Sequence, residues 1–157
     1  MRLFFVLLLA LVSAPGTPER PAVFTATQAA SGKIEIQKNL FGACTDCHAT
    51  SLTGRTGKPG ELPPLASLSD DYQTLINNNA GVVPALVGPE FRAKWTSRST
   101  KDLIDEFEMR FAPPGSRMSL ETRLNLIAFL LQANGGKPGA QPLTLSTIAP
   151  LAQILQN

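Results

Sequence analysis

The chain has 157 residues, which is enough for one domain with a modest core and too few for two comfortable ones. Its 14 basic and 12 acidic residues leave a net charge of +2, which argues against a nucleic-acid-binding protein with its strong basic excess. Only 17% of the residues are charged, whereas 12 are glycine and 13 are proline, and this composition favours a fold rich in loops.

The first residues are typical of an export signal. A basic residue, Arg2, is followed by the apolar run Leu3–Val12 and then by the small residues Ser13 and Ala14. The run is shorter than the roughly 20 residues that span a bilayer. We therefore expect residues 1–24 to be a leader and the protein to be periplasmic or otherwise exported. Membrane contact is expected only if this leader stays uncut, in which case it would anchor the chain.

A first helix is predicted from Ser31, a residue type suited to an N-cap, toward the cysteines. Ile36, Leu40 and Cys44 recur at intervals of four residues and form one apolar stripe along this helix. The stripe would pack on the rest of the core and would carry a cysteine at its end.

The segment CTDCH, residues 44–48, contains both cysteines of the chain and its only histidine. Its spacing fits the attachment signature of c-type haem. Residues three apart lie near each other on one face of a helix, so Cys44 and Cys47 could each form a thioether with one vinyl group of a porphyrin. His48 would then bind the iron through one ring nitrogen and donate from the other to a backbone carbonyl. We therefore expect one covalently bound haem c per chain.

Three other uses of these residues compete with haem attachment. A structural zinc ion needs about four nitrogen or sulfur ligands, and the cysteines and the histidine supply only three, in neighbouring positions. A thioredoxin-like redox site needs a βαβ setting, which no run of β-branched residues indicates. A structural disulfide, the usual state of two thiols in an exported protein, would leave His48 without a role. Haem attachment is therefore the preferred interpretation.

The middle of the chain, residues 50–98, is dense in proline, glycine and asparagine. So long a loop is uncommon in a compact domain. A large buried prosthetic group would explain it, because loops can pack on the ring instead of on each other. A short helix around residues 69–78 is expected to interrupt this stretch.

Two further helices are predicted after the loop-rich middle. The first covers 99–111 and is capped by Ser99 or Thr100, with Asp102 in its first turn. The second covers 119–136 and has the strongest helical pattern of the chain, with Ser119 as its N-cap and with Asn134, Gly135 and Gly136 as its C-terminal stop. Their buried stripes are predicted to be Leu103, Phe107 and Phe111 in the first helix, and Leu120, Leu124, Ile127 and Leu131 in the second. The apolar tail, residues 136–157, could dock on the domain or on a partner, and its sequence does not decide between them.

A helix that leads into C-x-x-C-H, a loop-rich middle and a C-terminal amphipathic helix resemble a class I cytochrome c, here over residues 25–135. The chain is more narrowly similar to the small monohaem cytochromes c found with pyrroloquinoline quinone dehydrogenases. This similarity is carried by PALVGPEFRAKW (84–95), DLI (102–104), PPGS (113–116) and SLETRLNLIAFLLQANGG (119–136). It covers residues 35–135, with a departure at 60–82 that looks like an insertion.

The resemblance implies an all-α chain with a small cytochrome c fold, in which three to five helices and long loops surround one covalently bound haem. It implies that Pro84 and Leu86 lie against the haem. Trp95 would lie near the haem propionates, where its indole N–H can donate a hydrogen bond. Phe129 would pack against the first helix.

The sixth iron ligand departs from the family pattern. The family places a methionine just before the Pro-Pro pair, where this chain has Phe111 and Ala112. Apart from the initiator, two methionines are left. Met118 lies in a loop before the last helix and is the preferred ligand, whereas Met109 is the alternative, although helical spacing would turn it to solvent. An open iron is the remaining option.

These features predict an exported electron-transfer protein rather than an enzyme, with redox proteins as its partners and no nucleic acid. It would carry one electron between a dehydrogenase and a downstream acceptor, either an oxidase or another cytochrome. One alternative is a haem protein with an open or weakly ligated iron that binds a small ligand, motivated by the missing methionine. Another is an electron-transfer subunit of a dehydrogenase complex, motivated by the apolar tail.

Overall fold

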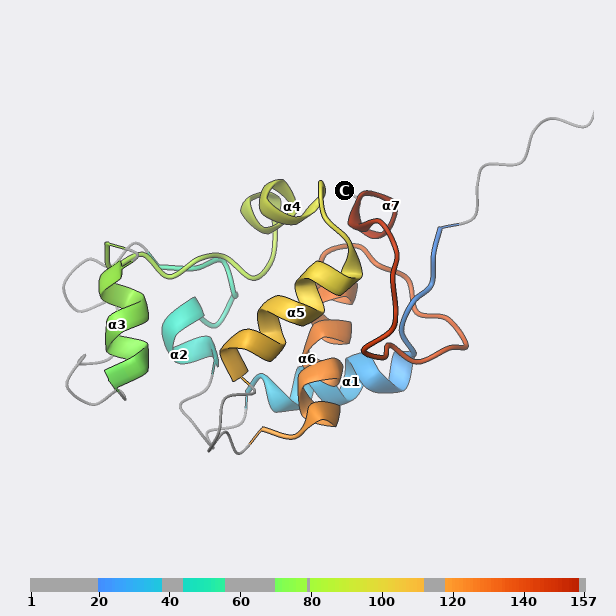
Figure 1. The fold of residues 1–157 in the computed structure, drawn as a ribbon, viewed down its shortest axis with the longest axis horizontal. Helices are drawn as coiled ribbons and strands as arrows, with labels where there is room; N and C mark the ends of the chain where they lie inside the picture. Colours follow the sequence, from blue (N-terminus) through green and yellow to red (C-terminus); the bar gives the residue numbers. More distant parts are fainter. Residues whose placement is uncertain (1–19, 38–43, 56–69, 79, 112–117, 156–157) are drawn as a thin grey trace, which may run out of the picture.

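The computed structural model describes residues 20–37, 44–55, 70–78, 80–111 and 118–155 (Figure 1). Within these ranges the helices are α1 (Ala26–Glu35), α2 (Cys44–His48), α3 (Asp70–Asn78), α4 (Pro89–Trp95), α5 (Thr100–Phe111), α6 (Leu120–Ala133) and α7 (Leu151–Ile154). The described residues form no strand, only two isolated β-bridges. The predicted all-α class is therefore confirmed. The helices outnumber the three to five expected, because the short α4 and α7 form where loop and tail were expected.

The expected leader lies almost wholly outside the described residues. Only its last residues are described, and of these Phe24 is fully buried and Val23 packs beside it. Among the described parts of the chain, no helix has the length and apolar character needed to cross a membrane.

Helix α1 begins earlier than predicted, and Thr25 rather than Ser31 is its N-cap. The Thr25 hydroxyl accepts a hydrogen bond from the backbone N–H of Gln28 at 3.2 Å, and the Gln28 side-chain oxygen accepts one from the backbone N–H of Thr25 at 3.3 Å. This reciprocal capping box satisfies two backbone donors at once. The same Gln28 amide bonds both backbone groups of Leu143 in the tail, at 2.7 and 3.0 Å. Helix α1 ends at Glu35, and the predicted continuation through 38–43 falls outside the described residues.

Helices α1 and α6 pack closely against each other, with α1 along the lower side of the molecule in Figure 1. Gly32 lies at their contact. A Cβ atom at this position would be 1.9 Å from the backbone oxygen of Asn125 and 2.9 Å from Cβ of Phe129. Glycine is therefore required for the observed separation of the two helices. Phe129 does lie against the first helix, as the resemblance implied.

The predicted starts of the helices at 99–111 and 119–136, which are α5 and α6, are confirmed. The Asp102 carboxylate accepts hydrogen bonds from the backbone N–H and the hydroxyl of Ser99, both at 2.8 Å, and these bonds hold the pKa of Asp102 below its ordinary value. The Ser119 hydroxyl accepts a hydrogen bond from the backbone N–H of Thr122 at 3.1 Å. The predicted burial of Leu120 is wrong, since it is 39% exposed at the first turn of α6.

The predicted stripes otherwise lie inward where the structure describes them. Leu103, Ile127 and Leu131 are fully buried, and Phe107 and Leu124 are partly buried. Phe111 is the last member of the α5 stripe, and its side chain is not among those that the structure describes.

The apolar tail packs on the domain itself. It contributes to a main cluster that also draws on the N-terminal segment, α1, α4, α5 and α6: Phe24, Ala29, Phe91, Trp95, Leu103, Ile104, Ile127, Ala128, Leu131, Leu143, Ala149, Leu151, Ile154 and Leu155. The buried Thr100 hydroxyl donates to the Thr147 carbonyl at 2.8 Å and accepts from the Ala149 N–H at 2.9 Å. The tail is therefore bound to the start of α5 by hydrogen bonds as well as by apolar packing.

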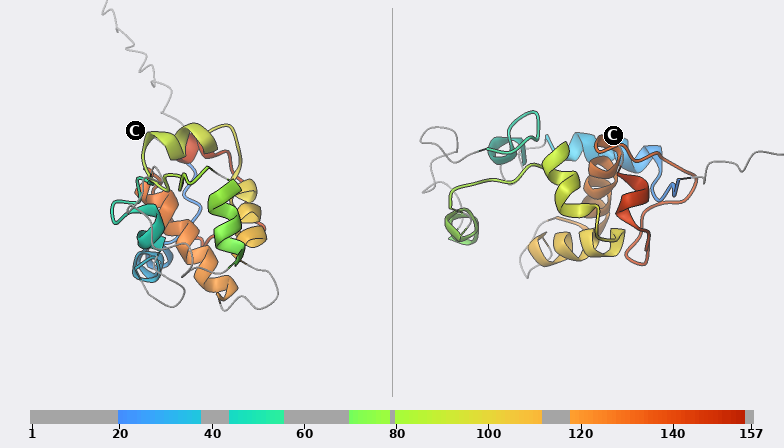
Figure 2. Two further views of the ribbon diagram at one scale, coloured as in Figure 1. Left: turned by 90° about the vertical axis from the view of Figure 1, so that its left-hand side faces the viewer. Right: turned by 90° about the horizontal axis from the view of Figure 1, so that it is seen from above.

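A second, smaller group of apolar residues lies beside α2 and is here named the Cys44 cluster. Its buried members are Ile36, Leu52, Leu126 and Leu130, and its partly buried members are Cys44, Leu86, Val87, Phe107, Met118 and Phe129. Helices α2 and α3 lie at one end of the molecule and α7 lies toward the other (Figures 1 and 2). The Cys44 cluster thus joins the end that carries α2 to the central α5 and α6.

Candidate functional site

Helix α2 carries the two thiols three residues apart, a spacing that places them near each other on one helical face. Cys44 and Cys47 are half-buried, and neither forms a disulfide. Burial raises the pKa of both thiols, and the Asp46 carboxylate raises that of Cys47 further. A redox-active C-x-x-C relies on a lowered thiol pKa. This environment therefore gives no support to a thioredoxin-like site.

His48 ends α2 and is hydrogen-bonded to a segment far along the chain. Its Nδ1 lies 2.7 Å from the backbone carbonyl oxygen of Pro84. A carbonyl oxygen can only accept, so Nδ1 must be the protonated nitrogen and donate. In the neutral ring the lone pair is then on Nε2, the nitrogen suited to a metal. The contact thereby selects the tautomer and orients the imidazole.

Backbone hydrogen bonds hold the segment that carries the Pro84 carbonyl against the loop after α2. The Leu52 carbonyl accepts from the backbone N–H of Leu86 at 2.8 Å. Arg55 and Val83 exchange two backbone hydrogen bonds of 3.0 Å each, as an isolated antiparallel bridge. Because these bonds lie on both sides of Pro84, they place its carbonyl at the histidine.

The loop after α2 has an unusual backbone. Gly54 has φ +82°, and a Cβ there would lie 2.6 Å from the Val83 carbonyl oxygen, so both conformation and close approach require glycine. Ala49 and Leu52 also have positive φ, at 65° and 59°. Such a conformation costs a residue with a side chain about 1–2 kcal/mol, and it persists only where surrounding structure enforces it. The tight turn returns the chain beside the histidine.

Asn134, the C-cap of α6, holds the same segment from the opposite side. Its side chain is almost completely buried. Its amide nitrogen donates to the carbonyls of Leu86 at 3.0 Å and Leu130 at 2.8 Å, and its oxygen accepts from the backbone N–H of Gly88 at 2.9 Å. One side chain therefore satisfies three backbone groups and joins the histidine-binding segment to the end of α6.

Arg55 carries a buried polar atom without a partner. Its Nε is inaccessible to solvent and has no hydrogen-bond partner among the described residues. The guanidinium lies near enough to Cys47 for its positive charge to oppose the rise in that thiol's pKa. Buried polar groups are nearly always hydrogen-bonded, so this N–H is suited to donate a hydrogen bond to an anionic oxygen. A carboxylate on a bound group would satisfy it.

The two candidate methionines lie in different surroundings. Met118 is half-buried and packs in the Cys44 cluster, as do Cys44 and Leu86. Met109 is 69% exposed on α5. The structure therefore brings Met118, and not Met109, into the apolar group that contains the first thiol. Residues 112–117, where the family has its methionine, lie outside the described residues.

Trp95 lies apart from this group. It is buried in the main cluster, with Phe91 as its aromatic neighbour at 6.1 Å between ring centroids. The charged ends of Lys94 and Arg98 lie over its ring, 5.2 and 5.0 Å from the centroid. The expected place of Trp95 beside the haem propionates remains a prediction.

Sequence reasoning missed two polar residues of the site. Arg55 belongs to no sequence motif. The one signal beside it is Gly54, which indicates a turn just before this residue. Asn134 was interpreted only as part of a helix stop with the two glycines that follow it. The contacts of Asn134 are with segments distant in sequence, for which periodicity carries no signal.

Within the described residues, no group of three His, Cys, Asp or Glu side chains is arranged to hold a metal ion. Comparison with known proteins finds no family, no curated sequence and no solved structure that matches the chain. The interpretation of the site therefore depends on its own geometry and chemistry.

Proposed function

We propose that this protein is an exported monohaem cytochrome c with a small cytochrome c fold. It would carry one electron at a time between a dehydrogenase and a downstream acceptor. One observation carries the proposal: the 2.7 Å hydrogen bond from Nδ1 of His48 to the Pro84 carbonyl. A histidine that follows C-x-x-C must keep Nε2 for iron and hold its ring still, and this bond serves both needs.

The other residues near the thiols fit a covalently bound haem. Cys44 and Cys47 would form the two thioethers from one helical face, while Pro84 and Leu86 would lie against the ring. The buried Nε of Arg55 lacks a hydrogen-bond acceptor. A haem propionate would supply that acceptor and a charge opposite to that of the guanidinium. These groups come from α2, from the loop that follows it and from residues 84–86, and backbone hydrogen bonds join that loop to residues 83–86.

When bound, haem supplies the one-electron couple of its iron. The Pro84 carbonyl, by accepting from Nδ1, makes the His48 imidazole a stronger ligand. The apolar residues packed around Cys44 would bury part of a bound haem, and such burial is one of the factors that set a haem potential. Met118 would be the sixth ligand, and a thioether there raises the potential and closes the iron to small molecules.

Two alternatives receive less support. An open iron that binds a small ligand was motivated by the missing family methionine, but Met118 packs in the same cluster as Cys44. A subunit of a dehydrogenase complex was motivated by the apolar tail. Leu143, Leu151 and Ile154 of that tail are buried in the protein's own core, so only its exposed residues Leu145 and Ile148 are left to support this alternative.

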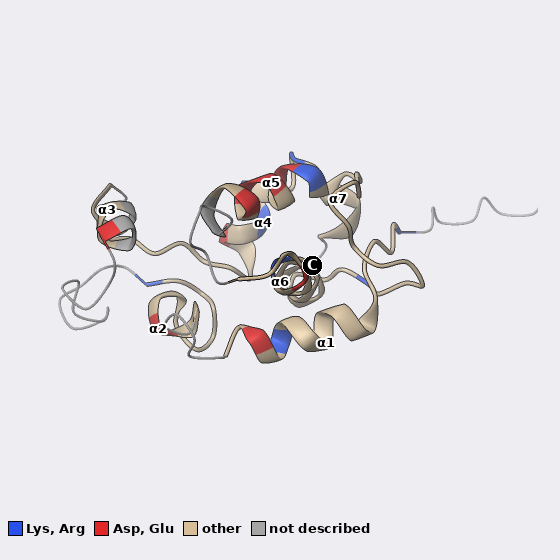
Figure 3. Ribbon diagram, turned by 60° about the horizontal axis from the view of Figure 1, so that its bottom comes forward, with Lys and Arg blue, Asp and Glu red and all other residues tan. Residues whose placement is uncertain are grey.

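The surface gives no strong electrostatic preference for a partner. Acidic and basic residues both occur on α4 and α5 (Figure 3). A mixed surface with a small net charge provides little long-range steering. We propose that redox partners dock chiefly through apolar contact at the exposed haem edge.

Covalent attachment tests the proposal. The full chain would be produced in a periplasm with haem-maturation machinery, then denatured and extracted with acidic acetone. We expect the pigment to stay with the polypeptide, because thioethers survive conditions that remove coordinated haem. The double variant Cys44→Ser/Cys47→Ser should lose it. The matched control Thr45→Ala changes a spacer residue inside the motif and should retain it.

A colourless wild-type protein after this treatment would overturn the proposal. Where pigment is retained, binding of carbon monoxide to the reduced protein separates the two haem functions. Slow or absent binding supports the electron carrier, whereas fast binding supports the open-iron alternative.

A further inference from the structure

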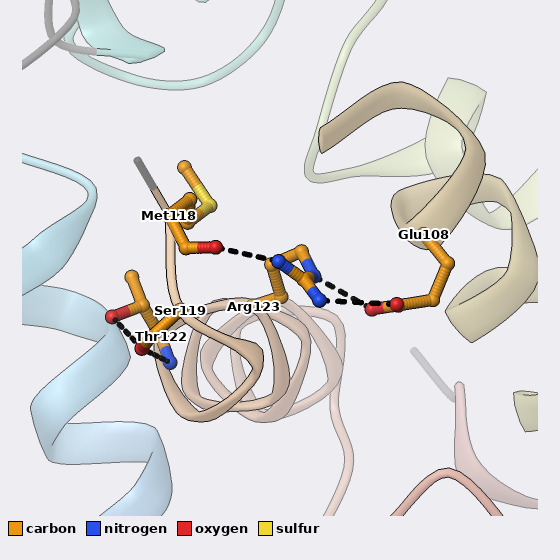
Figure 4. A network of polar contacts seen from close by, with 5 residues as sticks. All are labelled: Glu108, Met118, Ser119, Thr122 and Arg123. Atoms are coloured by element: carbon orange, nitrogen blue, oxygen red, sulfur yellow. Dashed lines mark hydrogen bonds and ion pairs between the residues drawn. The ribbon is translucent and has the colours of Figure 1, made fainter. Parts of the chain in front are cut away.

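An ion pair between α5 and α6 lies next to the segment that leads into α6 (Figure 4). Arg123 is buried, with 8% of its surface exposed. Its Nε and Nη2 donate to the two carboxylate oxygens of Glu108 at 2.7 and 3.1 Å. A buried guanidinium is costly unless it is paired in good geometry, and this two-point contact supplies such a pair. Arg123 is thereby held in one orientation.

The third contact of this arginine is directed at Met118. Its Nη1 donates to the Met118 backbone carbonyl at 2.5 Å (Figure 4). The next residue, Ser119, is the N-cap of α6, so the Met118 carbonyl lies directly before a capped helix start. In a hydrophobic staple the residue before the N-cap packs against an apolar residue at the fourth helical position. Here that position is Arg123, which bonds the carbonyl and leaves the methionine side chain to pack elsewhere.

The methionine side chain packs in the Cys44 cluster. Thioether coordination requires the sulfur to be held within bonding distance of iron, and a side chain with three rotatable bonds is poorly ordered by itself. A fixed backbone removes much of that freedom. Another ion pair of α5 joins the exposed side chains of Lys101 and Asp105 within the first turns of the helix.

We propose that Arg123, oriented by Glu108, is a positioning residue that holds Met118 in place as the sixth ligand of the iron. This inference rests on the proposed haem function. Loss of the Arg123–Glu108 ion pair would leave the haem attached and the bond from His48 to iron unchanged. It would weaken the binding of the Met118 sulfur to iron. The protein would then bind external ligands at a site that is normally closed.

The test compares Arg123→Gln, Glu108→Gln and Arg123→Lys with the wild type in the haem-loaded full chain. The readouts are the long-wavelength absorption band of methionine-bound ferric haem and the rate of imidazole binding. Both glutamine variants should weaken the band and accelerate imidazole binding by about tenfold or more, the effect of losing one charged hydrogen bond. Arg123→Lys keeps the charge without the fork and should recover part of the band. Lys101→Gln is the matched control and should change neither readout.

Two methionine variants identify which residue binds the iron, and Glu108→Gln serves as the less disruptive change to the ion pair. Met118→Ala should abolish the band, and Met109→Ala should retain it. Should Arg123→Gln fail to fold, Glu108→Gln, which keeps a hydrogen-bond acceptor of the same shape, carries the test.

The outcomes distinguish this inference from the proposed function. Covalent haem with an unchanged band and unchanged imidazole rates in the glutamine variants would overturn the role of Arg123 and leave the cytochrome intact. A wild-type haem protein without the band would exclude Met118 as ligand and with it the inference. A chain that never attaches haem would overturn both.

Discussion

At Asn134, a single buried amide satisfies three backbone groups, two carbonyls and one N–H. Two of them, on Leu86 and Gly88, belong to the segment that also presents the Pro84 carbonyl to His48. Loss of this side chain would remove its hydrogen bonds to the partly buried groups on Leu86 and Gly88, whereas the Leu130 carbonyl would keep the backbone N–H of Asn134 as a partner. A group left unpaired costs about 1–3 kcal/mol when it is buried. The residue therefore matters both for stability and for the orientation of the histidine.

We expect Asn134→Ala to lower the free energy of unfolding by about 2 kcal/mol, on the basis of the two lost contacts with Leu86 and Gly88. Urea unfolding of the variant and the wild type measures the difference. Gln132→Ala, at an exposed position in the last turn of the same helix, should change it by less than about 0.5 kcal/mol. Equal unfolding curves for Asn134→Ala and the wild type would contradict the structural role given to this amide.

At the scale of elements, the contact between α1 and α6 determines how the helices pack. Two effects oppose each other at Gly32. Alanine is favoured over glycine in a helix by about 1 kcal/mol. However, its methyl group would lie 1.9 Å from the Asn125 carbonyl oxygen and 2.5 Å from the carbonyl carbon. These are backbone atoms of the partner helix, so the helices would have to move apart.

Gly32→Ala should therefore destabilise the protein despite its better helix propensity. Overpacking of this kind costs about 1–3 kcal/mol and sometimes more, which exceeds the propensity gain. Thermal unfolding followed by circular dichroism checks this, with Lys33→Ala, exposed on the same helix, as the control that should change the midpoint little. A raised midpoint for Gly32→Ala would show that the two helices are not in the close contact described here.

At the scale of the whole molecule, two apolar clusters hold most of the described elements together. The main cluster joins the N-terminal segment, α1, α4, α5, α6 and the tail, and the Cys44 cluster joins α2 and its loops to α5 and α6. Phe107 packs against both, so the clusters are continuous through α5. The tail therefore supports the helices against which the candidate site is built.

We predict that Leu151→Ala lowers the free energy of unfolding by about 2–5 kcal/mol, the usual cost of removing a fully buried leucine side chain. Leu151 has no exposed surface in the main cluster. Gln153→Ala, on the exposed face of the same short helix, should have almost no effect on denaturant unfolding. If both variants unfold alike, the tail does not form part of the core.

Local patterns in the sequence were sufficient for the all-helical class, for the caps at Ser99 and Ser119, and for the helix around residues 69–78. Each of these depends on residues within a few positions of one another, where hydrogen bonds and helical spacing act directly. The C-x-x-C-H motif is also local, so the two thiols and the histidine could be grouped without a structure. Its assignment to haem remains the proposal to be tested.

Contacts between distant segments could be decided only by the tertiary structure. The carbonyl that meets His48 is 36 residues away, and the backbone groups held by Asn134 are as many as 48 away. The start of α1 at Thr25 also depends on the tail, because Gln28 completes its cap while binding Leu143. Apolar periodicity specifies which face of a helix is buried but not which segment covers it. For that reason the sequence alone indicated the residues that could bind a haem, whereas the folded chain decided which residues surround them.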